Sequence, residues 1–312
     1  MFISIFSMHI TNTKSYILIC CSFDVRYSPK ISIDFIGVIV DINIYWLKLS
    51  ARLEYNHAQN YHEMSYWFFI ERHNINSIHF LLSMSKNILI IGGNSEIGKH
   101  LGKLCHNDAY SLYVTSRSGQ SEIEGTQIQC DPLGDLSVLD ELPESLDGFV
   151  YCPGTINLKS LQRMTLDDLQ NDMNINFFGA FNTFKHVLSK LKKDNGASAV
   201  FFSTVAAQTG MTFHSSIAAA KGALESFAKA SAAELAPRLA INVIAPSITK
   251  TPMASNLLSD DKKIDASADR HPLKEIGSPE QVAKTARFLL DAKENWITGQ
   301  IVNQDGGMST LK

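Results

Sequence analysis

The spacing of apolar residues changes along the chain, and the clearest pattern begins just after residue 84. Four consecutive apolar residues occupy positions 88–91, as is typical of a strand buried on both faces. Two glycines follow, and Ile97, Leu101 and Leu104 then recur at spacings of four and three, which predicts one face of a helix. A buried strand, a glycine turn and a helix in this order are typical of a nucleotide-binding βαβ unit.

The glycines of this turn indicate where a phosphate group would bind. Gly92 and Gly93 allow the backbone to bend sharply and come close to a ligand, and Gly98 lets the helix pack against the sheet. Amide groups at the start of the helix would face a diphosphate, because they have no partner within the helix. Glycine turns between a strand and a helix also occur without a ligand, so this pattern leaves both interpretations open.

The first 83 residues differ in composition from the rest of the chain. They contain one of the 18 glycines, Gly37, and one of the 9 prolines, Pro29, which leaves them almost without turn signals. We interpret residues 1–83 as a poorly structured N-terminal extension, either disordered or not part of the functional protein, and place the domain at residues 84–312. The alternation of apolar and polar residues in 31–44 favours, as the alternative, a small accessory layer.

Composition and charge narrow the class of partner. The chain has 312 residues, 45% of them hydrophobic, which is enough to bury a core, and a net charge of −3 gives no basic surface for nucleic acid. The longest apolar segment, residues 35–47, is interrupted by Asp41 and is shorter than the roughly 20 residues of a membrane-spanning helix. We therefore expect a small-molecule ligand, with neither a nucleic-acid nor a membrane partner.

The cysteine and histidine positions indicate no metal site and no disulfide framework. The five cysteines form no CxxC pair, and the histidines show neither HxH nor HxxxH spacing. The amino end has no basic residues before its first apolar run and lacks the arginine-rich character of a transit peptide. Reduced cysteines and the missing targeting pattern together predict a cytoplasmic protein.

From residue 84 to its end, the chain resembles the short-chain dehydrogenase/reductase family. The resemblance rests on five motifs in the family's order, which read IGGNSEIG, DGFVYCPG, NINFFGAF, RLAINVIAPSITKTPM and WITGQIVNQDGG. It implies an α/β fold with a single Rossmann-type, doubly wound parallel sheet. It also implies an NAD(P)(H)-dependent oxidoreductase that transfers hydride to or from a small carbonyl, alcohol or activated double bond.

Two of these motifs depart from the family's pattern. In the glycine turn, Ile91 and Glu96 replace the family's threonine and middle glycine, and Glu96 places a carboxylate beside the expected diphosphate. A glutamate in the first turn suits the helix dipole and need not repel phosphates if it points outward. In DGFVYCPG, only Gly154 remains of the family's NNAG.

The resemblance also assigns the residues that would hold the cofactor. Residues 111–118 predict the second strand, and Ser116 and Arg117 stand where an acidic residue would bind a ribose hydroxyl. A guanidinium can bind a phosphate through two parallel bonds, which favours NADP(H), with NAD(H) as the alternative. A solvated loop arginine is the other interpretation of Arg117. The cofactor-binding set is Gly92, Gly93, Asn94, Ser95, Ile97, Gly98, Ser116, Arg117, Asp131, Gly154, Lys221, Pro246, Ile248 and Thr251.

The family's chemistry uses a serine, a tyrosine four residues before a lysine, and an asparagine on the fourth helix. By resemblance, Thr204, Lys221 and Asn176 occupy three of these positions, but Ile217 stands in the tyrosine's place and has no proton to exchange. A positioned acid or base is worth about 10² to 10⁴ in rate, so its loss weakens catalysis without abolishing it. The alternative function is a non-catalytic, NADP(H)-binding regulatory protein.

A few polar side chains could replace the missing phenol. His214 lies seven residues before Lys221 and would share its helical face if the helix has begun by then. Ser215, Ser216 and Tyr151 are the other candidates. Helix capping and solvent contact offer an alternative explanation of this serine- and histidine-rich turn.

The resemblance also implies a homo-oligomer, a dimer or tetramer that pairs through the fourth and fifth helices. The fourth helix carries an apolar face suited to the core and to subunit contact, formed by Phe178, Phe181, Phe184, Val187, Leu188 and Leu191. Residues 253–276 correspond to the family's mobile substrate lid.

Overall fold

The computed structural model describes residues 86–191, 196–291 and 296–311 in full and, ahead of residue 86, the backbone of five strands. The chain divides into two compact units, Met1–Ser85 and Lys86–Lys312. This division lies within two residues of the boundary that the change in composition predicts.

The first unit forms a five-stranded sheet in the order β1-β2-β3-β4-β5, in which all neighbours are antiparallel. The segment 31–44, whose alternation favours a strand, overlaps β3. The prediction that residues 1–83 form a poorly structured extension falls on a segment whose side chains and connections lie outside the described residues. The five strands are Ile5–Thr13, Tyr16–Phe23, Ile31–Asp41, Ile44–Leu53 and His62–Ile70.

The second unit is built on a seven-stranded parallel sheet in the order β12-β11-β10-β9-β6-β7-β8. From β6 the chain first winds outward to β8, then returns to the other side of β6 and winds outward again to β12. This reversal confirms the predicted doubly wound Rossmann-type sheet, and ligands of such sheets bind where the winding reverses. The strands are β6 (Asn87–Ile91), β7 (Ser111–Ser116), β8 (Thr126–Gln129), β9 (Gly148–Tyr151), β10 (Ala197–Phe202), β11 (Leu239–Pro246) and β12 (Ile301–Gln304).

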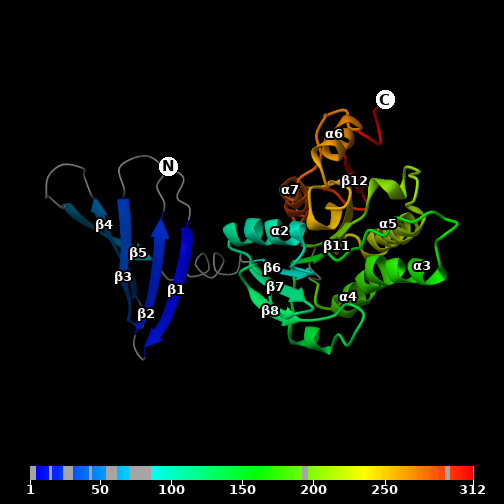
Figure 1. Cartoon of the computed structure of the whole chain (residues 1–312). Helices are drawn as coiled ribbons and strands as arrows, with labels where there is room; N and C mark the ends of the chain where they lie inside the picture. Colours follow the sequence, from blue (N-terminus) through cyan, green and yellow to red (C-terminus); the bar gives the residue numbers. More distant parts are fainter. Residues whose placement is uncertain are drawn as a thin grey trace. The chain divides into compact units, whose positions relative to one another are not determined.

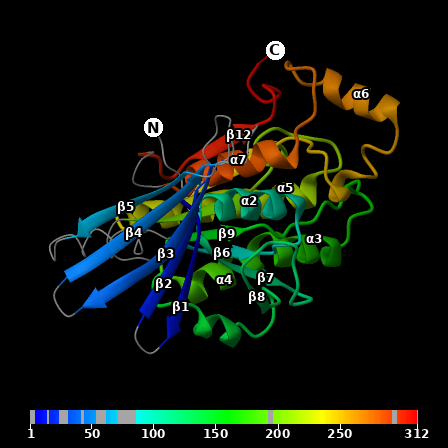
Figure 2. The same ribbon diagram turned by 90° about the vertical axis from the view of Figure 1, so that its left-hand side faces the viewer.

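Helices cover both faces of this sheet (Figures 1 and 2). Ile88 and Ile90 of β6 pack into an apolar cluster with α2 and α7, while Leu89 and Ile91 pack into a second cluster with α4 and α5. The unbroken apolar run is therefore needed because successive side chains point to opposite, equally buried faces. The helices are α2 (Glu96–Asn107), α3 (Leu166–Met173), α4 (Gly179–Val187), α5 (Ser215–Leu235), α6 (Asp261–Asp269) and α7 (Pro279–Leu289).

The fourth helix that the sequence predicts is interrupted by a π-helical segment. The π segment Asn174–Phe178 lies between α3 and α4, and the backbone stays helical through all three. One wide turn of this kind shifts the register of the helix and is frequent at functional sites. Phe184 and Val187 face the core as expected, whereas Phe178 is 40% exposed.

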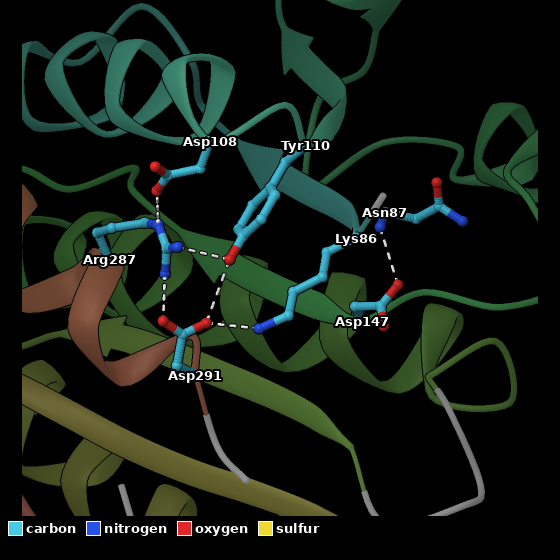
Figure 3. A network of polar contacts seen from close by, with 7 residues as sticks. All are labelled: Lys86, Asn87, Asp108, Tyr110, Asp147, Arg287 and Asp291. Atoms are coloured by element: carbon cyan, nitrogen blue, oxygen red, sulfur yellow. Dashed lines mark hydrogen bonds and ion pairs between the residues drawn. The ribbon is translucent and has the colours of Figure 1, made fainter. Parts of the chain in front are cut away.

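A network of charged residues joins the amino end of the sheet to α7 (Figure 3). Arg287 binds Asp108 and Asp291 at 2.7 Å each, and it also donates to the Tyr110 hydroxyl. Lys86, just before β6, pairs with Asp291. Burial would raise the pKa of Asp291, but the bonds from Lys86 and Arg287 outweigh it and hold that pKa below its ordinary value. This network lies at the opposite end of the strands from the glycine turn.

In the part of the chain that the structure describes, no helix is both long and apolar enough to cross a membrane.

Candidate functional site

The glycine turn between β6 and α2 requires glycine at both positions. Gly92 has a φ of +77°, and a Cβ on Gly93 would lie 2.2 Å from a methyl group of Val114. The amides of both glycines donate to the Thr115 carbonyl, at 3.1 and 2.9 Å, and so fix the turn against β7. Both glycines therefore shape the site, and their own amides are already engaged.

The first amides of α2 are the donors that remain open. Ser95 caps the helix, because its hydroxyl accepts from the Gly98 amide at 3.0 Å. The backbone amides of Glu96 and Ile97 have no hydrogen-bond partner among the described residues. Free amides at a helix amino terminus, where the helix dipole is positive, can bind an anion. The edge of the sheet beside β6 is thus able to hold a diphosphate.

The carboxylate of Glu96, which replaces a glycine in the family's pattern, is paired. Lys99 binds Glu96 at 3.2 Å and Glu122 at 3.1 Å. The bonds from Glu122 and Glu96 raise the pKa of Lys99 above its ordinary value. The Glu96 carboxylate is therefore turned toward an ammonium group that it shares with Glu122.

At the end of β7, Ser116 and Arg117 point in different directions. The Ser116 hydroxyl is buried and donates to the Gln120 carbonyl at 2.9 Å, so it shapes the loop. Arg117 is exposed, and its guanidinium has no ion-pair partner among the described residues. Of the two, Arg117 alone can reach a ligand phosphate. Asp131, just beyond β8, is exposed and accepts from the Leu133 amide.

Asn176 and Lys221 meet beside Gly154, which follows β9. A Cβ on Gly154 would lie 3.2 Å from the Asn176 side-chain oxygen and 3.7 Å from the Lys221 amine. Lys221 is 6% exposed and donates to the Phe202 carbonyl at 2.7 Å. Burial lowers the pKa of Lys221 to about 8. The structure therefore brings together two groups that are 45 residues apart in the sequence.

The end of β10 presents Thr204 and buries Ser203. Ser203 is 6% exposed and donates to Glu225 at 2.5 Å, whereas Thr204 is partly exposed and accepts from the Ala206 amide at 3.3 Å. The backbone places successive side chains on opposite sides. Thr204 is thus the hydroxyl of this pair that can contact a ligand.

Ile217 and two of the candidate substitutes are buried. Ile217 is 4% exposed on α5. Tyr151 is 1% exposed, and its hydroxyl donates to the Ile175 carbonyl at 2.7 Å. Ser216 is fully buried and donates to Asp172. The core encloses the hydroxyls of Tyr151 and Ser216, and each donates to a protein acceptor, which argues against either of them as the source of the missing proton.

His214 lies just before α5, so the helix has not begun at this residue. Its Nδ1 lies 2.7 Å from the Thr212 carbonyl, and because a carbonyl only accepts, Nδ1 must carry the hydrogen. The ring makes no capping bond to the helix. Neighbouring Ser215 is exposed. His214 and Ser215 therefore remain the candidates with solvent access.

A buried carboxylate, Asp172, lies next to this site and is not indicated by any sequence motif. It accepts from the Thr155 hydroxyl at 2.7 Å and from the Ser216 hydroxyl at 2.5 Å. Thr155 in turn accepts from the Asn176 side chain at 2.7 Å. Asp172 lies four residues before Asn176, a spacing that places two residues on one helix face, but this spacing does not show which hydroxyls of other elements meet the carboxylate.

The loop after β11 completes the edge of the site. Pro246, Ile248 and Thr251 are all partly exposed. Ser247, between them, bonds the buried His271 at 2.8 Å. Among the described residues no cluster of three or more histidine, cysteine or acidic side chains could hold a metal ion.

The parallel sheet, the glycine turn and the polar groups gathered at one sheet edge define a Rossmann-type nucleotide-binding protein. A protein-family model described as enoyl-(acyl carrier protein) reductase matches residues 137–309, more than half of the chain. The chain belongs to the short-chain dehydrogenase/reductase family, a family of oxidoreductases, as its motifs predict.

Curated relatives and solved structures agree with this assignment. The chain is 28% identical over 245 residues to the 3-oxoacyl-[acyl-carrier-protein] reductase FabG of Buchnera aphidicola subsp. Baizongia pistaciae, covering 73% of this chain and 99% of that protein. It is 29% identical over 239 residues to carbonyl reductase family member 4 of Xenopus laevis, covering 72% and 98%. The structure of ElxO with NADP bound matches with a TM-score of 0.65 and 26% identity, covering 72% and 99%. Aldohexose dehydrogenase of Thermoplasma acidophilum, at 24% identity and a TM-score of 0.67 with coverage of 73% and 95%, shares the fold.

Proposed function

We propose that the protein is an NADP(H)-dependent oxidoreductase that transfers hydride to or from a small carbonyl, alcohol or activated double bond, with NAD(H) as the alternative cofactor. The observation that carries this proposal is the approach of Lys221 and Asn176 to one point beside Gly154, next to the open amides of α2. The relatives support it, because they include reductases and a structure named for its bound NADP.

The residues present fit a dinucleotide. The Glu96 and Ile97 amides would hold the diphosphate at the α2 terminus. Arg117 would bind a 2′-phosphate, since its guanidinium is exposed and unpaired within the described part of the chain. Lys221 would donate to the nicotinamide ribose. When bound, the cofactor supplies or accepts the hydride.

The remaining members of the cofactor set are assigned by their places around this edge. Gly92, Gly93 and Gly98 shape the turn, and Ser95 caps the helix. The others are expected to line the cofactor as the family resemblance implies: Asn94, Ser116, Asp131, Gly154, Pro246, Ile248 and Thr251.

Side chains of the protein would orient the substrate. The proton that the missing tyrosine would exchange must come from another group. We assign Thr204 the role of holding the substrate oxygen, and Asn176 that of keeping the polar groups around Lys221 in place. Positioning can contribute about 7 to 11 kcal/mol to a reaction barrier, whereas the missing acid would add about 3 to 5 kcal/mol. Turnover is therefore expected at a reduced rate, with water, His214 or Ser215 as the proton source.

A second candidate function follows from the burial of Ile217. Because an isoleucine fills the position beside Lys221 and cannot exchange a proton, the protein could instead bind NADP(H) without turnover and act as a regulator. Both functions require the dinucleotide to bind. We further propose a cytoplasmic homo-oligomer, a dimer or tetramer, with a small-molecule substrate.

The test of the proposed function is a fluorescence titration of the protein with NADPH and with NADH. Arg117→Ala should weaken NADPH binding about tenfold or more, because a bidentate charged contact to phosphate is lost, and should leave NADH binding nearly unchanged. Arg163→Ala is the matched control, since Arg163 is another exposed arginine and its guanidinium bonds only Ser160 among the described residues. If neither nucleotide binds the wild-type protein, both functions are wrong.

A further inference from the structure

Asp172 is a buried carboxylate to which the proposed function gives no part. It is 2% exposed and belongs to α3, one turn before Asn176. Its two oxygens accept from hydroxyls of two different elements, Thr155 in the loop after β9 and Ser216 in the first turn of α5. Removing an ionised carboxylate from water is costly unless hydrogen bonds and an opposite charge compensate it.

Each oxygen of the Asp172 carboxylate has a hydroxyl group within hydrogen-bond distance. The Asn176 side-chain amide donates to the Thr155 hydroxyl oxygen at 2.7 Å. The Thr155 hydrogen is then directed to Asp172 at 2.7 Å, and the Ser216 hydroxyl donates to the other oxygen at 2.5 Å. Asp172 therefore acts as an acceptor at both oxygens, as a carboxylate does.

Asp172 and Lys221 make no direct ion pair, but both reach Gly154 by a short route: the Lys221 amine and the Asn176 side chain lie beside this glycine, and the Thr155 hydroxyl links Asn176 to Asp172. Two acidic or thiol groups act on Lys221, Cys152 after β9 and Asp172 on α3, and Glu225 follows one turn further along α5. Burial raises the pKa of the Cys152 thiol to about 12, so this group is neutral near physiological pH. Glu225 is directed to Ser203 and Gln208. Asp172 acts on the pKa of Lys221 in the direction that favours the ammonium form.

We propose that Asp172 is a positioning residue whose buried carboxylate is the counter-charge of the Lys221 ammonium group and, through the Thr155 hydroxyl, fixes the side-chain amide of Asn176. This inference rests on the proposed function, because it gives Lys221 and Asn176 their roles there. Asp172 contacts neither substrate nor cofactor and acts through these two residues.

The proposal predicts the direction in which NADPH affinity changes with pH. Burial lowers the pKa of Lys221 to about 8, so the ammonium group is present below that pH and is lost as the pH rises through it. NADPH affinity should fall over the same range, because the bonds that the ammonium group donates are lost. Without the negative charge of Asp172, the ammonium group is less favoured, and this fall should occur at lower pH.

The experiment is an NADPH titration of the full chain across the neutral to alkaline range. In Asp172→Asn, which keeps the shape of the side chain and removes its charge, the alkaline fall in affinity should move down by about one pH unit. Glu225→Gln is the matched control, since Glu225 is also buried and lies on the helix that carries Lys221. Its alkaline fall should coincide with that of the wild type. Equal shifts in both variants, or none in Asp172→Asn, would overturn the proposal.

A double-mutant cycle tests the charge pair without any cofactor. Asp172→Asn, Lys221→Met and the double variant are compared by thermal unfolding. If the two charges stabilise each other, the double variant should lose less stability than the two single variants together. Additive losses contradict the pairing even if NADPH does not bind, and a failure of NADPH to bind the wild type counts only against the proposed function.

Discussion

Position 217 tests whether a phenol beside Lys221 raises the activity that we propose for this protein. Ile217→Tyr restores a phenol four residues before Lys221, and we expect a gain of about 10² to 10⁴ in NADPH-dependent reduction of carbonyl substrates, because a positioned acid is regained. The rate is followed as oxidation of NADPH over a panel of small ketones, aldehydes and enones.

Ile217→Phe separates the effect of the tyrosine hydroxyl from the effect of the larger ring. Both variants enlarge a side chain that is 4% exposed, so each should lose about 1–3 kcal/mol of stability through overpacking. Only the tyrosine variant should gain activity. Equal activity in the two variants would show that the phenol has no role, and substantial activity of the wild type would exclude the non-catalytic alternative.

At the scale of single residues, the sequence predicts which residues belong to the site better than it predicts which side chains surround them. The spacing to Lys221 and the NINFFGAF motif single out Asn176 and Ile217, and the structure places Asn176 beside Lys221 at Gly154. The burial of Tyr151 and the network around Asp172 were not predicted. Those features depend on which side chains from separate elements meet, and spacing along the chain does not contain that information.

Among the elements, the turn from β6 to α2 leaves no room for one added methyl group. Gly93→Ala would place its Cβ 2.2 Å from a Val114 methyl, and we expect a loss of about 1–3 kcal/mol in the free energy of unfolding together with weaker NADPH binding. Thermal unfolding and the fluorescence titration measure the two effects.

Gly210→Ala is the matched control for this substitution. No atom lies within 4 Å of the Cβ that it adds, and Gly210 has no left-handed φ. Its stability should stay within about 0.5 kcal/mol of the wild type. If both variants behave alike, the tight fit between the turn and β7 has no energetic consequence.

Helices and strands with a strong periodicity of apolar residues are predicted correctly, and irregular segments are not. The apolar run at 88–91 and the helical spacing after it predict β6 and α2, because each pattern follows from burial on two faces or on one. The π segment at Asn174–Phe178 was not predicted. The apolar residues of this segment continue the pattern of a regular helix, so the one residue that the π turn holds in excess of an α turn cannot be recognised in the sequence.

For the whole molecule, the second unit should fold without the first. The second unit is compact by itself and contains the whole seven-stranded sheet and, among the described residues, both apolar clusters. A truncated variant beginning at residue 84 should therefore keep its unfolding midpoint and its NADPH affinity. Truncation to residue 92 is the control, because it removes β6 from the sheet and should abolish folding. If the variant beginning at residue 84 aggregates or fails to bind, the first 83 residues are part of the functional protein.

The π segment has a consequence for how this site could change during evolution. It holds one residue more than a regular turn, so losing any one of its five positions would restore an ordinary α-helix. Because the wide turn absorbs the extra residue, the helices on either side would keep their faces, whereas the residues inside the segment, Asn176 among them, would move relative to Thr155 and Gly154. Descendants of this chain could lose that single residue at little cost to folding, and they would then keep the scaffold while the asparagine no longer reached its neighbours.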